Sequence, residues 1–417
     1  MLVKTILNNC QRFKSFVYGN VCFMQYRFQN IIRVEILPRK NSKAICSNCS
    51  KVSSLYDKID HRYFEFIPLW GYPVYFFYQM RRVNCKYCGI KVEKLPWAAG
   101  KSTMTTIFMH YLSNWARHLS WLDVARRFRV SWDKVASSIK YIVEWGRARQ
   151  PLGNITAVGV DEVQWKRGHK YLTLVYQINQ GAVRLLWICK KRTEDSFKKF
   201  FTFLGKERCN IIEYICSDMW KPYLKVIREK LKNAVHILDR FHIVSMLNKA
   251  LDKVRAGEHR KMKSDGHEPI LKNSRWCLLK RPENLTEKQE VKLKDLLSYN
   301  LKSVRGYLLK EDFRGFWEYV SPAWAEKFFH RWSVRVMRSK IEPMKKVVKT
   351  LRKHKHLILN WFKAKKMFSS GIVEGLNNKV KLTMRKSYGF RTYKHIEIAL
   401  YHALGKLPEP ELTHKFF

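Results

Sequence analysis

Residues 155–189 read ITAVGVDEVQWKRGHKYLTLVYQINQGAVRLLWIC, and this stretch decides the fold class. It holds three apolar runs rich in β-branched and aromatic residues, separated by a turn at Gly168 and by Asn-Gln-Gly at 179–181. Such runs between turn residues predict an antiparallel meander of three strands. The first strand ends in the acidic pair Asp161 and Glu162.

Strand and helix patterns alternate after the meander. The sequence IIEYICSDMW predicts a short buried strand that ends at Asp218, and KPYLKVIREKL predicts a helix. A further strand, NAVHILDRFH, closes at Asp239, Arg240 and His242. This order predicts an α/β sheet with helices on both faces. Residues 243–367 break the rhythm and predict a helical insertion carried by the sheet domain.

Three carboxylates are candidates for a shared site. Asp161 and Asp218 follow apolar strands, and ligands of α/β sheets collect at the carboxyl ends of strands. Glu374 is the only carboxylate in residues 343–396, which hold fifteen lysines and arginines, so its position in this basic segment favours a specific role. Mg²⁺ or Mn²⁺ takes oxygen ligands of this kind, and two such ions can support phosphodiester cleavage. The alternatives are turn-forming aspartates and a glutamate favoured by a helix dipole.

The helix around Glu374 has two predicted faces. Its buried stripe recurs every four residues, at Ile372, Leu376, Val380 and Met384. The other face carries Glu374 followed by Asn377, Lys381 and Arg385. An amide and two cations behind a carboxylate predict contact with a DNA backbone beside a metal site.

The overall charge points to a polyanionic partner. The chain has 417 residues, with 81 Lys and Arg against 34 Asp and Glu, which gives a net charge of +47. Nucleic acid is the partner that such a charge favours. The 46% of hydrophobic residues exclude a disordered basic tail, and the length predicts about two to four domains. A structural nucleic-acid binder would share these totals.

Two pairs of cysteines have the spacing of zinc knuckles. They are CSNC, with Cys46 and Cys49, and CKYC, with Cys85 and Cys88. Four thiolates suit a tetrahedral Zn²⁺ ion. The segment between the pairs is rich in β-forming aromatics around Gly71, so we expect a hairpin that brings the knuckles together. A redox motif or four unrelated core cysteines are the alternatives.

Residues 120–145, SWLDVARRFRVSWDKVASSIKYIVEW, predict two helices across a tight turn. Ser120 with Asp123 is a capping pattern for the first helix, and Ser131 caps the second. The pair resembles a helix-turn-helix whose recognition helix spans residues 132–140. An ordinary corner of two helices is the alternative. The predicted DNA-contacting side chains are Trp132, Lys134 and Lys140.

No apolar run approaches the roughly eighteen residues of a membrane span. The first residues also lack the features of a signal peptide. We therefore expect a cytoplasmic, nucleoid-associated protein without a membrane partner, in which the cysteines are reduced or metal-bound.

Several motifs together resemble a known family. They are LPWAAGKS, AVGVDEVQWKRGHKYLTLV, CSDMWKPY, ILDRFHIV and GIVEGLNNKVKLTMRKSYGF. In these motifs the chain is similar to bacterial insertion-sequence transposases of the ISL-three family, which are DDE transposases. One departure is Ser370, because the family often has Asn before the glycine that corresponds to Gly371.

The resemblance implies a metal-binding triad of Asp161, Asp218 and Glu374. Asp239 and His242 match a further family motif and are candidates for supporting the triad from beside it. A structural pair of Asp239 with Arg240 is the alternative.

The predicted fold class is α/β: a ribonuclease-H-like catalytic core with a helical insertion, preceded by a zinc ribbon and an all-α helix-turn-helix domain. The expected segments are the zinc-ribbon region, the helix-turn-helix, the first part of the core, the insertion and the C-terminal part of the core, at 1–100, 101–150, 151–242, 243–367 and 368–417.

The predicted function is DNA transposition. The expected enzyme binds the terminal inverted repeats of an insertion sequence, uses two Mg²⁺ or Mn²⁺ ions to cut and join double-stranded DNA, and carries structural Zn²⁺. Synapsis of two ends requires at least a dimer. The alternatives are a non-catalytic DNA-binding regulator derived from a transposase and a structure-specific nuclease.

Overall fold

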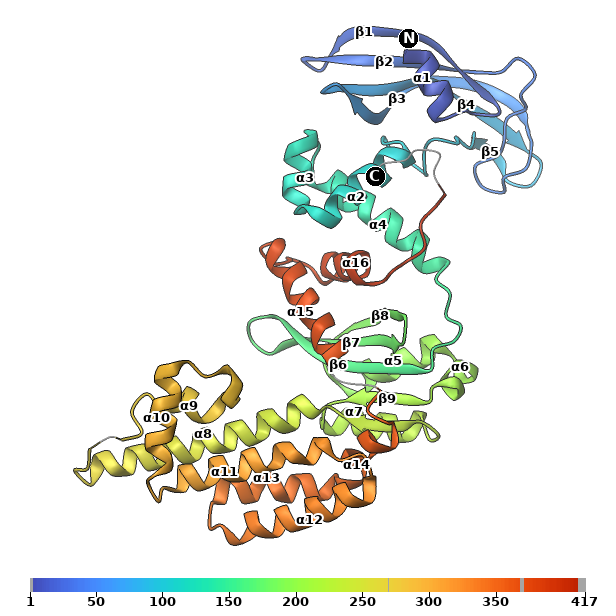
Figure 1. The fold of residues 1–417 in the computed structure, drawn as a ribbon. Coiled ribbons are helices and arrows are strands. Elements are labelled where there is room, and N and C mark those ends of the chain that lie inside the picture. Colours follow the sequence, from blue (N-terminus) through green and yellow to red (C-terminus); the bar gives the residue numbers. More distant parts are fainter. Residues whose placement is uncertain (1–2, 269, 368–370, 412–417) are drawn as a thin grey trace. The chain divides into compact units, whose positions relative to one another are not determined.

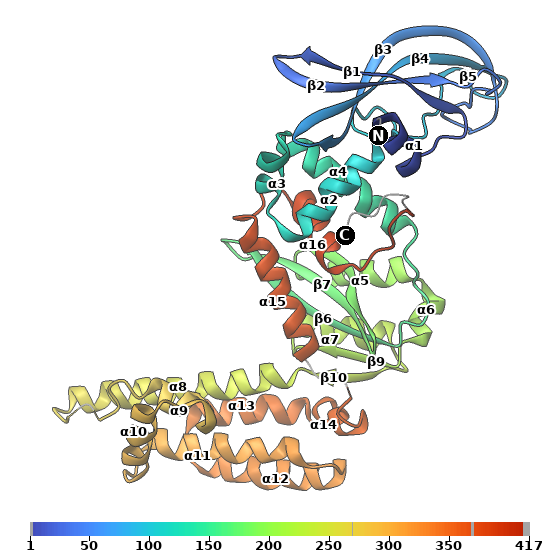
Figure 2. The same cartoon turned by 45° about the horizontal axis from the view of Figure 1, so that its top comes forward.

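The computed structural model describes residues 3–268, 270–367 and 371–411. The chain forms two compact units, of which one comprises residues 1–151 and 382–417 and the other residues 152–381. Figures 1 and 2 show their elements from two directions. The boundary between the units falls inside the continuous helix α15 (Gly371–Lys386).

The first unit begins with helix α1 (Val3–Cys10) and a five-stranded sheet. Its strands are β1 (Phe16–Tyr26), β2 (Gln29–Pro38), β3 (Ser54–Leu69), β4 (Tyr72–Cys85) and β5 (Gly89–Val92). The order is β1-β2-β4-β3, with β5 beside β4, and only the β2–β4 pair is parallel. Val34, Phe64 and Phe76 lie in register on one face and are completely buried, so this face carries the core.

The predicted hairpin is β3–β4. Its turn is formed by Trp70 and Gly71, with φ angles of 50° and 84°, which is the region that favours glycine. The expectation of a turn at Gly71 is therefore confirmed. The surrounding sheet is larger than the predicted ribbon, because the β1–β2 hairpin adds two strands to it.

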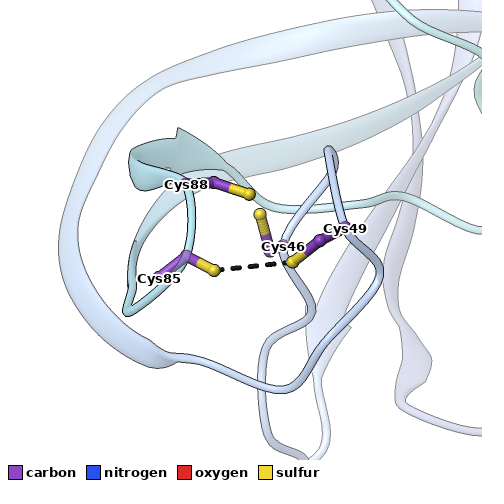
Figure 3. Close-up of side chains that lie close together, drawn as sticks. All are labelled: Cys46, Cys49, Cys85 and Cys88. Atoms are coloured by element: carbon purple, nitrogen blue, oxygen red, sulfur yellow. Dashed lines mark hydrogen bonds between the residues drawn. The ribbon is translucent and has the colours of Figure 1, made fainter.

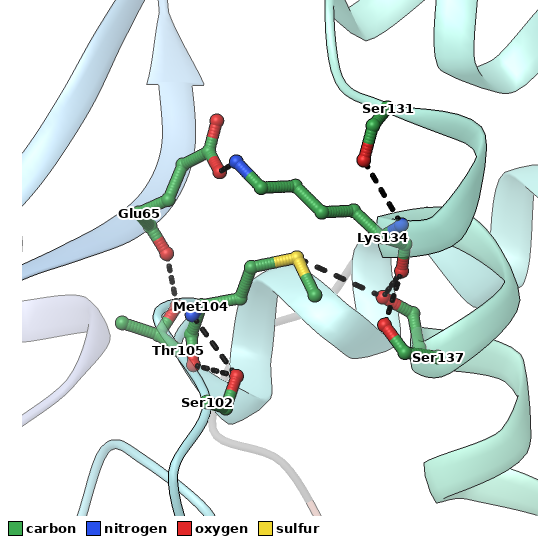
Figure 4. A network of polar contacts seen from close by, with 8 residues as sticks. Glu65, Ser102, Met104, Thr105, Ser131, Lys134 and Ser137 are labelled. Carbon is green, nitrogen blue, oxygen red and sulfur yellow. Dashed lines mark hydrogen bonds and ion pairs between the residues drawn. The ribbon is translucent and has the colours of Figure 1, made fainter.

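Four helices complete the first unit: α2 (Thr106–His118), α3 (Trp121–Phe128), α4 (Trp132–Ala148) and α16 (Tyr393–Leu404). The helices α2, α3 and α16 all pack against α4. Figure 4 shows how the sheet joins them, through Lys134 of α4, whose ammonium lies 2.5 Å from the Glu65 carboxylate on β3, and through Thr105, whose N–H donates to the Glu65 carbonyl.

The C-terminal segment departs from the predicted domain limits. All of residues 368–417 are predicted to belong to the catalytic core, whereas the described residues 382–411 group with the N-terminal unit. The reason is packing: the His402 ring lies 2.8 Å from the Ser113 hydroxyl, and the Arg147 guanidinium lies 3.6 Å from the Glu397 carboxylate. Residues 368–370 lie outside the described part of the chain.

The second unit is built on the predicted meander. Its strands are β6 (Ala157–Lys166), β7 (Lys170–Asn179), β8 (Ala182–Lys190), β9 (Tyr214–Ser217) and β10 (Val235–Leu238). The order is β10-β9-β6-β7-β8. The meander β6-β7-β8 is antiparallel, and β9 and β10 run parallel to β6, which confirms the predicted sheet.

Helices cover this sheet. They are α5 (Glu194–Leu204), α6 (Lys206–Ile211) and α7 (Lys221–Lys230), and side chains of all three segments join a buried core with the strands. The start of α15 lies against β6, where a Cβ atom on Gly159 would come 2.5 Å from the Val373 side chain. Gly159 therefore permits the close approach of helix and strand.

The predicted insertion is helical. It comprises α8 (Arg240–Ser264), α9 (Arg275–Leu279), α10 (Glu287–Leu297), α11 (Lys302–Arg314), α12 (Pro322–Arg338), α13 (Glu342–Lys353) and α14 (Lys355–Lys363), with short 3-10 turns at Pro282–Asn284 and Gly315–Glu318. The helices α11 and α13 pack against the long α8, and α14 packs against β10. No helix among the described residues has both the length and the apolar character that crossing a bilayer requires.

Candidate active site

Three aspartates stand level at one edge of the second sheet. Asp161 lies on β6, and Asp218 and Asp239 directly follow β9 and β10. On the three adjacent parallel strands, Ala157, Tyr214 and Val235 are register partners. Each aspartate lies four residues after the partner on its own strand. Since neighbouring strands are about 4.8 Å apart, the sheet places the three side chains in one row, with Asp218 in the middle.

Burial and mutual repulsion disfavour the charged forms of the first two aspartates. Desolvation raises the pKa of Asp161 to about 6, and the charges of Asp218 and Asp239 add to the effect. Desolvation also raises the pKa of Asp218 to about 6, followed by the charge of Glu162. A cation held between these carboxylates would relieve the repulsion, so the donor set fits a hard divalent ion.

A histidine balances part of this charge. Asp239 caps α8 by accepting the Phe241 N–H at 2.6 Å, and its second oxygen lies 2.9 Å from Nδ1 of His242. This hydrogen bond raises the pKa of His242 to about 9, with a further contribution from Asp161 and Asp218. The imidazole is therefore cationic at neutral pH beside the aspartates. The structure thus places Asp239 and His242 of the D-R-F-H motif next to Asp161 and Asp218.

Helix α15 is tied to the same edge through Asn377. Its amide nitrogen donates to the Asp161 carboxylate at 2.6 Å, and its amide oxygen accepts from the Tyr176 hydroxyl at 2.7 Å. The side chain is 6% exposed. This corrects the prediction that Asn377 contacts DNA, because both ends of the amide are engaged inside the protein. Asn377 orients Asp161 instead.

Glu374 lies one helical turn before Asn377. Residues three apart share a side of a helix, so Glu374 projects from the side that meets β6. Its carboxylate is half-buried and makes no hydrogen bond or ion pair with any described residue. Glu374 does not join Asp161 and Asp218 in a group whose ligand atoms all lie within 4.8 Å of one another; in the described ranges only four cysteines form such a group.

The two predicted cations of α15 are placed differently from Asn377. Lys381 and Arg385 are both exposed, and neither forms an ion pair with a residue in the described ranges. A role in DNA contact stays a prediction for them.

Sequence reasoning did not identify an ion pair beside Asp161. Burial raises the pKa of Glu162, and the charge of Asp161 adds to this rise. One Glu162 oxygen lies 3.2 Å from a terminal nitrogen of Arg192, which follows β8. The acidic pair at 161–162 was visible in the sequence, but no spacing linked it to an arginine thirty residues away.

Arg192 is held in place by aromatic rings. Its guanidinium lies over the Tyr171 ring at 4.2 Å and over the Trp220 ring at 4.6 Å. The Trp220 indole N–H donates to the Arg192 carbonyl at 3.2 Å, and the Trp220 backbone N–H donates to Asp218 at 3.0 Å. Trp220 thus links this cation to the loop that presents Asp218.

The predicted cysteine cluster is assembled in the first unit. Figure 3 shows Cys46, Cys49, Cys85 and Cys88, whose sulfur atoms all lie within 4.8 Å of one another. The β3–β4 hairpin carries the second pair back to the first, as expected. A hydrogen bond from the Tyr87 backbone lowers the pKa of Cys85 to about 6, which favours a thiolate. Four converging sulfurs fit a structural Zn²⁺ ion.

The two capped helices predicted within residues 120–145 are present as α3 and α4. The Ser120 hydroxyl accepts the Asp123 N–H at 3.1 Å, and the Ser131 hydroxyl accepts the Lys134 N–H at 3.3 Å. Arg129 ends α3 in the left-handed conformation, with a φ angle of 52°.

Of the three predicted DNA-contacting residues, Lys134 is tied to a buried partner, and contact of Trp132 and Lys140 with DNA stays a prediction. Trp132 packs against His395 with ring centres 5.0 Å apart, and the Lys134 ammonium is paired with buried Glu65 (Figure 4). Lys140 lies 3.7 Å from Glu144. The Lys140 contact is an exposed pair within α4, whereas the Lys134 pair joins α4 to β3. The exposed cations of the motif lie instead on α3 and in the turn, at Arg126, Arg127 and Arg129.

Comparisons with known proteins agree with this picture. A family model described as "Transposase" matches residues 158–400, which include all three predicted acids. The chain is 26% identical over 354 residues to the transposase for insertion sequence element IS1001 of Bordetella parapertussis, covering 84% of this chain and 86% of that protein. It is 27% identical over 383 residues to the transposase for insertion sequence element IS1557 of Mycobacterium tuberculosis, covering 86% and 85%.

Proposed function

Because the chain belongs to the ISL-three family of DDE transposases, we propose that it cuts and joins the DNA ends of an insertion sequence. In this proposal the enzyme binds terminal inverted repeats, a water molecule attacks a phosphodiester at the element end, and the freed 3′-OH attacks target DNA. The observation that carries the proposal is the row of level aspartates at the edge of β6, β9 and β10, to which Asn377 ties the helix of Glu374.

Asp161, Asp218 and Glu374 would hold two Mg²⁺ or Mn²⁺ ions. When bound, such ions supply Lewis-acid stabilisation of the phosphate and an activated nucleophile. The buried, mutually repelling aspartates and the uncommitted Glu374 carboxylate support this assignment. Asn377 keeps the Asp161 carboxylate oriented, and the Asp239–His242 pair offsets negative charge at the same edge.

Arg192 would contact a phosphate of the bound strand. The only hydrogen bond that its guanidinium makes to a described residue uses one terminal nitrogen, so its other N–H donors are available to an anion. The rings of Tyr171 and Trp220 hold the guanidinium without consuming those donors. A cation in this position would stabilise charge that develops on the phosphate.

The remaining parts of the chain fit the same function. We assign the sheet of the second unit to a ribonuclease-H-like core with a helical insertion, and the cysteine cluster to a structural Zn²⁺ ion. The first unit would bind the terminal repeats, and the enzyme would act on nucleoid DNA as at least a dimer. The net charge of +47 supports a DNA partner.

The test is an assay with a labelled terminal repeat of the element, target DNA and Mg²⁺. A transposase cuts the repeat and joins it to the target, a nuclease cuts without joining, and a regulator only binds. Asp161→Asn and Glu374→Gln are expected to abolish cutting while binding of the repeat survives. Cutting by either variant would overturn the assignment of the triad.

A further inference from the structure

A cleft in the first unit has no role in the proposed chemistry. It has a volume of about 540 Å³ and is formed by the starts of α3 and α4 together with residues 387–395. This volume lies in the range of small-ligand sites. The loop that closes it contains the Y-G-F part of the most specific motif in the sequence.

Aromatic rings form the walls of this cleft. The Trp121 ring lies 5.5 Å from that of Trp132 and 5.6 Å from that of Phe390, and the His395 ring lies 5.0 Å from that of Trp132. Trp121 is buried, and the other three rings are half-buried, so part of their surface faces the cleft. Such a wall suits a flat aromatic ligand.

Tyr388 stands at the rim of the cleft and is 97% exposed. Its φ angle is 50°, an unusual value for a large side chain, and the backbone N–H groups of Tyr388 and Gly389 are bonded to carbonyls of α15 at 3.0 and 2.9 Å. The loop is therefore anchored while its ring meets solvent. The two backbone bonds are those of a Schellman motif, which ends α15 with Tyr388 in the left-handed conformation and leaves its ring in solvent.

The cleft also has polar groups in or beside it, namely one hydrogen-bond acceptor and two cations. The Asp133 carboxylate lines the cleft and makes no hydrogen bond or ion pair with a residue that the structure describes, so it can accept from an amino group. Arg391 also lines the cleft, and Lys394 is exposed next to His395. Aromatic faces, an acceptor for exocyclic N–H groups and cations at the rim match a nucleobase and its phosphate.

We propose that this cleft binds an unpaired nucleobase of a DNA strand, stacked against Tyr388 and the aromatic wall. The inference rests on the proposed function, because it requires that the chain binds DNA. A base inside a duplex cannot reach such a cleft without leaving its stack, and that cost is smallest where the base is already unpaired. The site would therefore select DNA with a single-stranded or distorted segment.

The experiment measures the affinity of the full chain for two DNA duplexes that differ only in a short single-stranded extension. One extension carries normal nucleotides, and the other has the same backbone with abasic residues. Stacking on an aromatic side chain predicts about tenfold tighter binding of the extension with bases. Tyr388→Ala should bring the ratio of the two affinities close to one, and Tyr388→Phe should leave the ratio unchanged.

Phe28→Ala is the matched control, because Phe28 is also 97% exposed and also has a positive φ angle of 63°. It should leave the ratio unchanged, and all three variants should bind the blunt duplex like the wild type. As a second measurement, a 5-iododeoxyuridine in the extension should crosslink to peptides containing residues 121–132 or 387–395.

Equal wild-type affinity for the two extensions would overturn the inference, and so would an unchanged ratio in Tyr388→Ala or crosslinks elsewhere in the chain. These results with normal binding of the blunt duplex would leave the proposed function intact. If the wild type binds neither extension nor the blunt duplex, DNA binding itself fails and both proposals fall.

Discussion

The cysteine cluster and the acidic edge are both sets of residues whose chemistry suits metal ions, but the structure assembles them to different degrees. The four sulfurs lie within 4.8 Å of one another, whereas Asp161, Asp218 and Glu374 do not form so tight a group. Thiols can share protons and pack closely, while buried carboxylates repel one another and raise each other's pKa. A closed structural site can therefore form from its own residues, whereas a catalytic site of carboxylates would need ions to draw its acids together.

The largest expected effect is the loss of strand cleavage when the acidic edge is changed. Asp161→Asn or Asp218→Asn should lower the rate of strand cleavage by at least about a thousandfold, because a ligand of the catalytic ions is lost. The melting temperature should stay the same or rise, since a buried charge disappears. Cleavage rates and thermal melts on the same samples check both parts. A variant that cuts DNA at the wild-type rate would show that these aspartates do not hold the catalytic ions.

The next effect concerns stability rather than activity. Cys46→Ser should lower the free energy of unfolding of the first unit by several kcal/mol, because binding of Zn²⁺ contributes directly to folding. Removal of zinc by a chelator should have the same effect on the wild type. Cys22→Ser serves as the control, since Cys22 lies outside the cluster. Equal melting of Cys46→Ser and Cys22→Ser, with no zinc in the purified protein, would contradict the assignment.

The acidic edge should respond to pH when divalent ions are absent. The folded pKa values of Asp161 and Asp218 are about 6, above the ordinary value of 3.8, so these groups stabilise the fold at low pH and this stability is lost as the pH rises through about 6. The loss should reach about 3 kcal/mol for each of the two aspartates. His242 does not interfere, because it is protonated in both states over most of this range.

Denaturant unfolding at pH 4 to 7 with a chelator measures this loss. The quantity of interest is the difference between the wild type and a variant with Asp161→Asn and Asp218→Asn, since other groups also titrate here. The difference should disappear when Mg²⁺ is added. A wild type whose stability follows that of the double variant at every pH would contradict the account of repulsion.

The smallest effect tests the tether between α15 and the sheet. Asn377→Ala leaves one Asp161 oxygen and the Tyr176 hydroxyl without their hydrogen-bond partner and should cost about 1–3 kcal/mol of stability, together with part of the cleavage rate. Asn378→Ala is a matched control, because the neighbouring side chain is exposed. Similar melting temperatures of the two variants would show that the tether is not needed.

Local patterns were sufficient to predict much of the fold. The meander, the Gly71 turn and the two cysteine knuckles depend on residues close together in the sequence, and the structure contains all three. The contact between Asn377 and Asp161 joins residues 216 positions apart, and helical periodicity alone could not distinguish that buried amide from a solvent-facing one.

The helix-turn-helix pattern does not show which of its residues face the solvent, because this depends on packing. The sequence places Trp132 and Lys134 at the start of a second helix, where a recognition helix would carry its contacts. Whether such residues face DNA depends on their surroundings: Lys134 is paired with the buried Glu65, whereas Trp132 packs edge-on against His395 in the wall of a cleft. The domain limit within α15 was hidden for a similar reason, because a continuous helix gives no local signal of a boundary.

The central claim is that Asp161, Asp218 and Glu374 share bound divalent ions, and metal-directed cleavage of the protein backbone tests it most directly. Fe²⁺ in place of Mg²⁺, with ascorbate and peroxide, generates radicals that cut the chain near the bound ion, and mass spectrometry locates the cuts. The account predicts cuts close to all three acids, which excess Mg²⁺ suppresses. Cuts near Asp161 and Asp218 with none near Glu374 would contradict it.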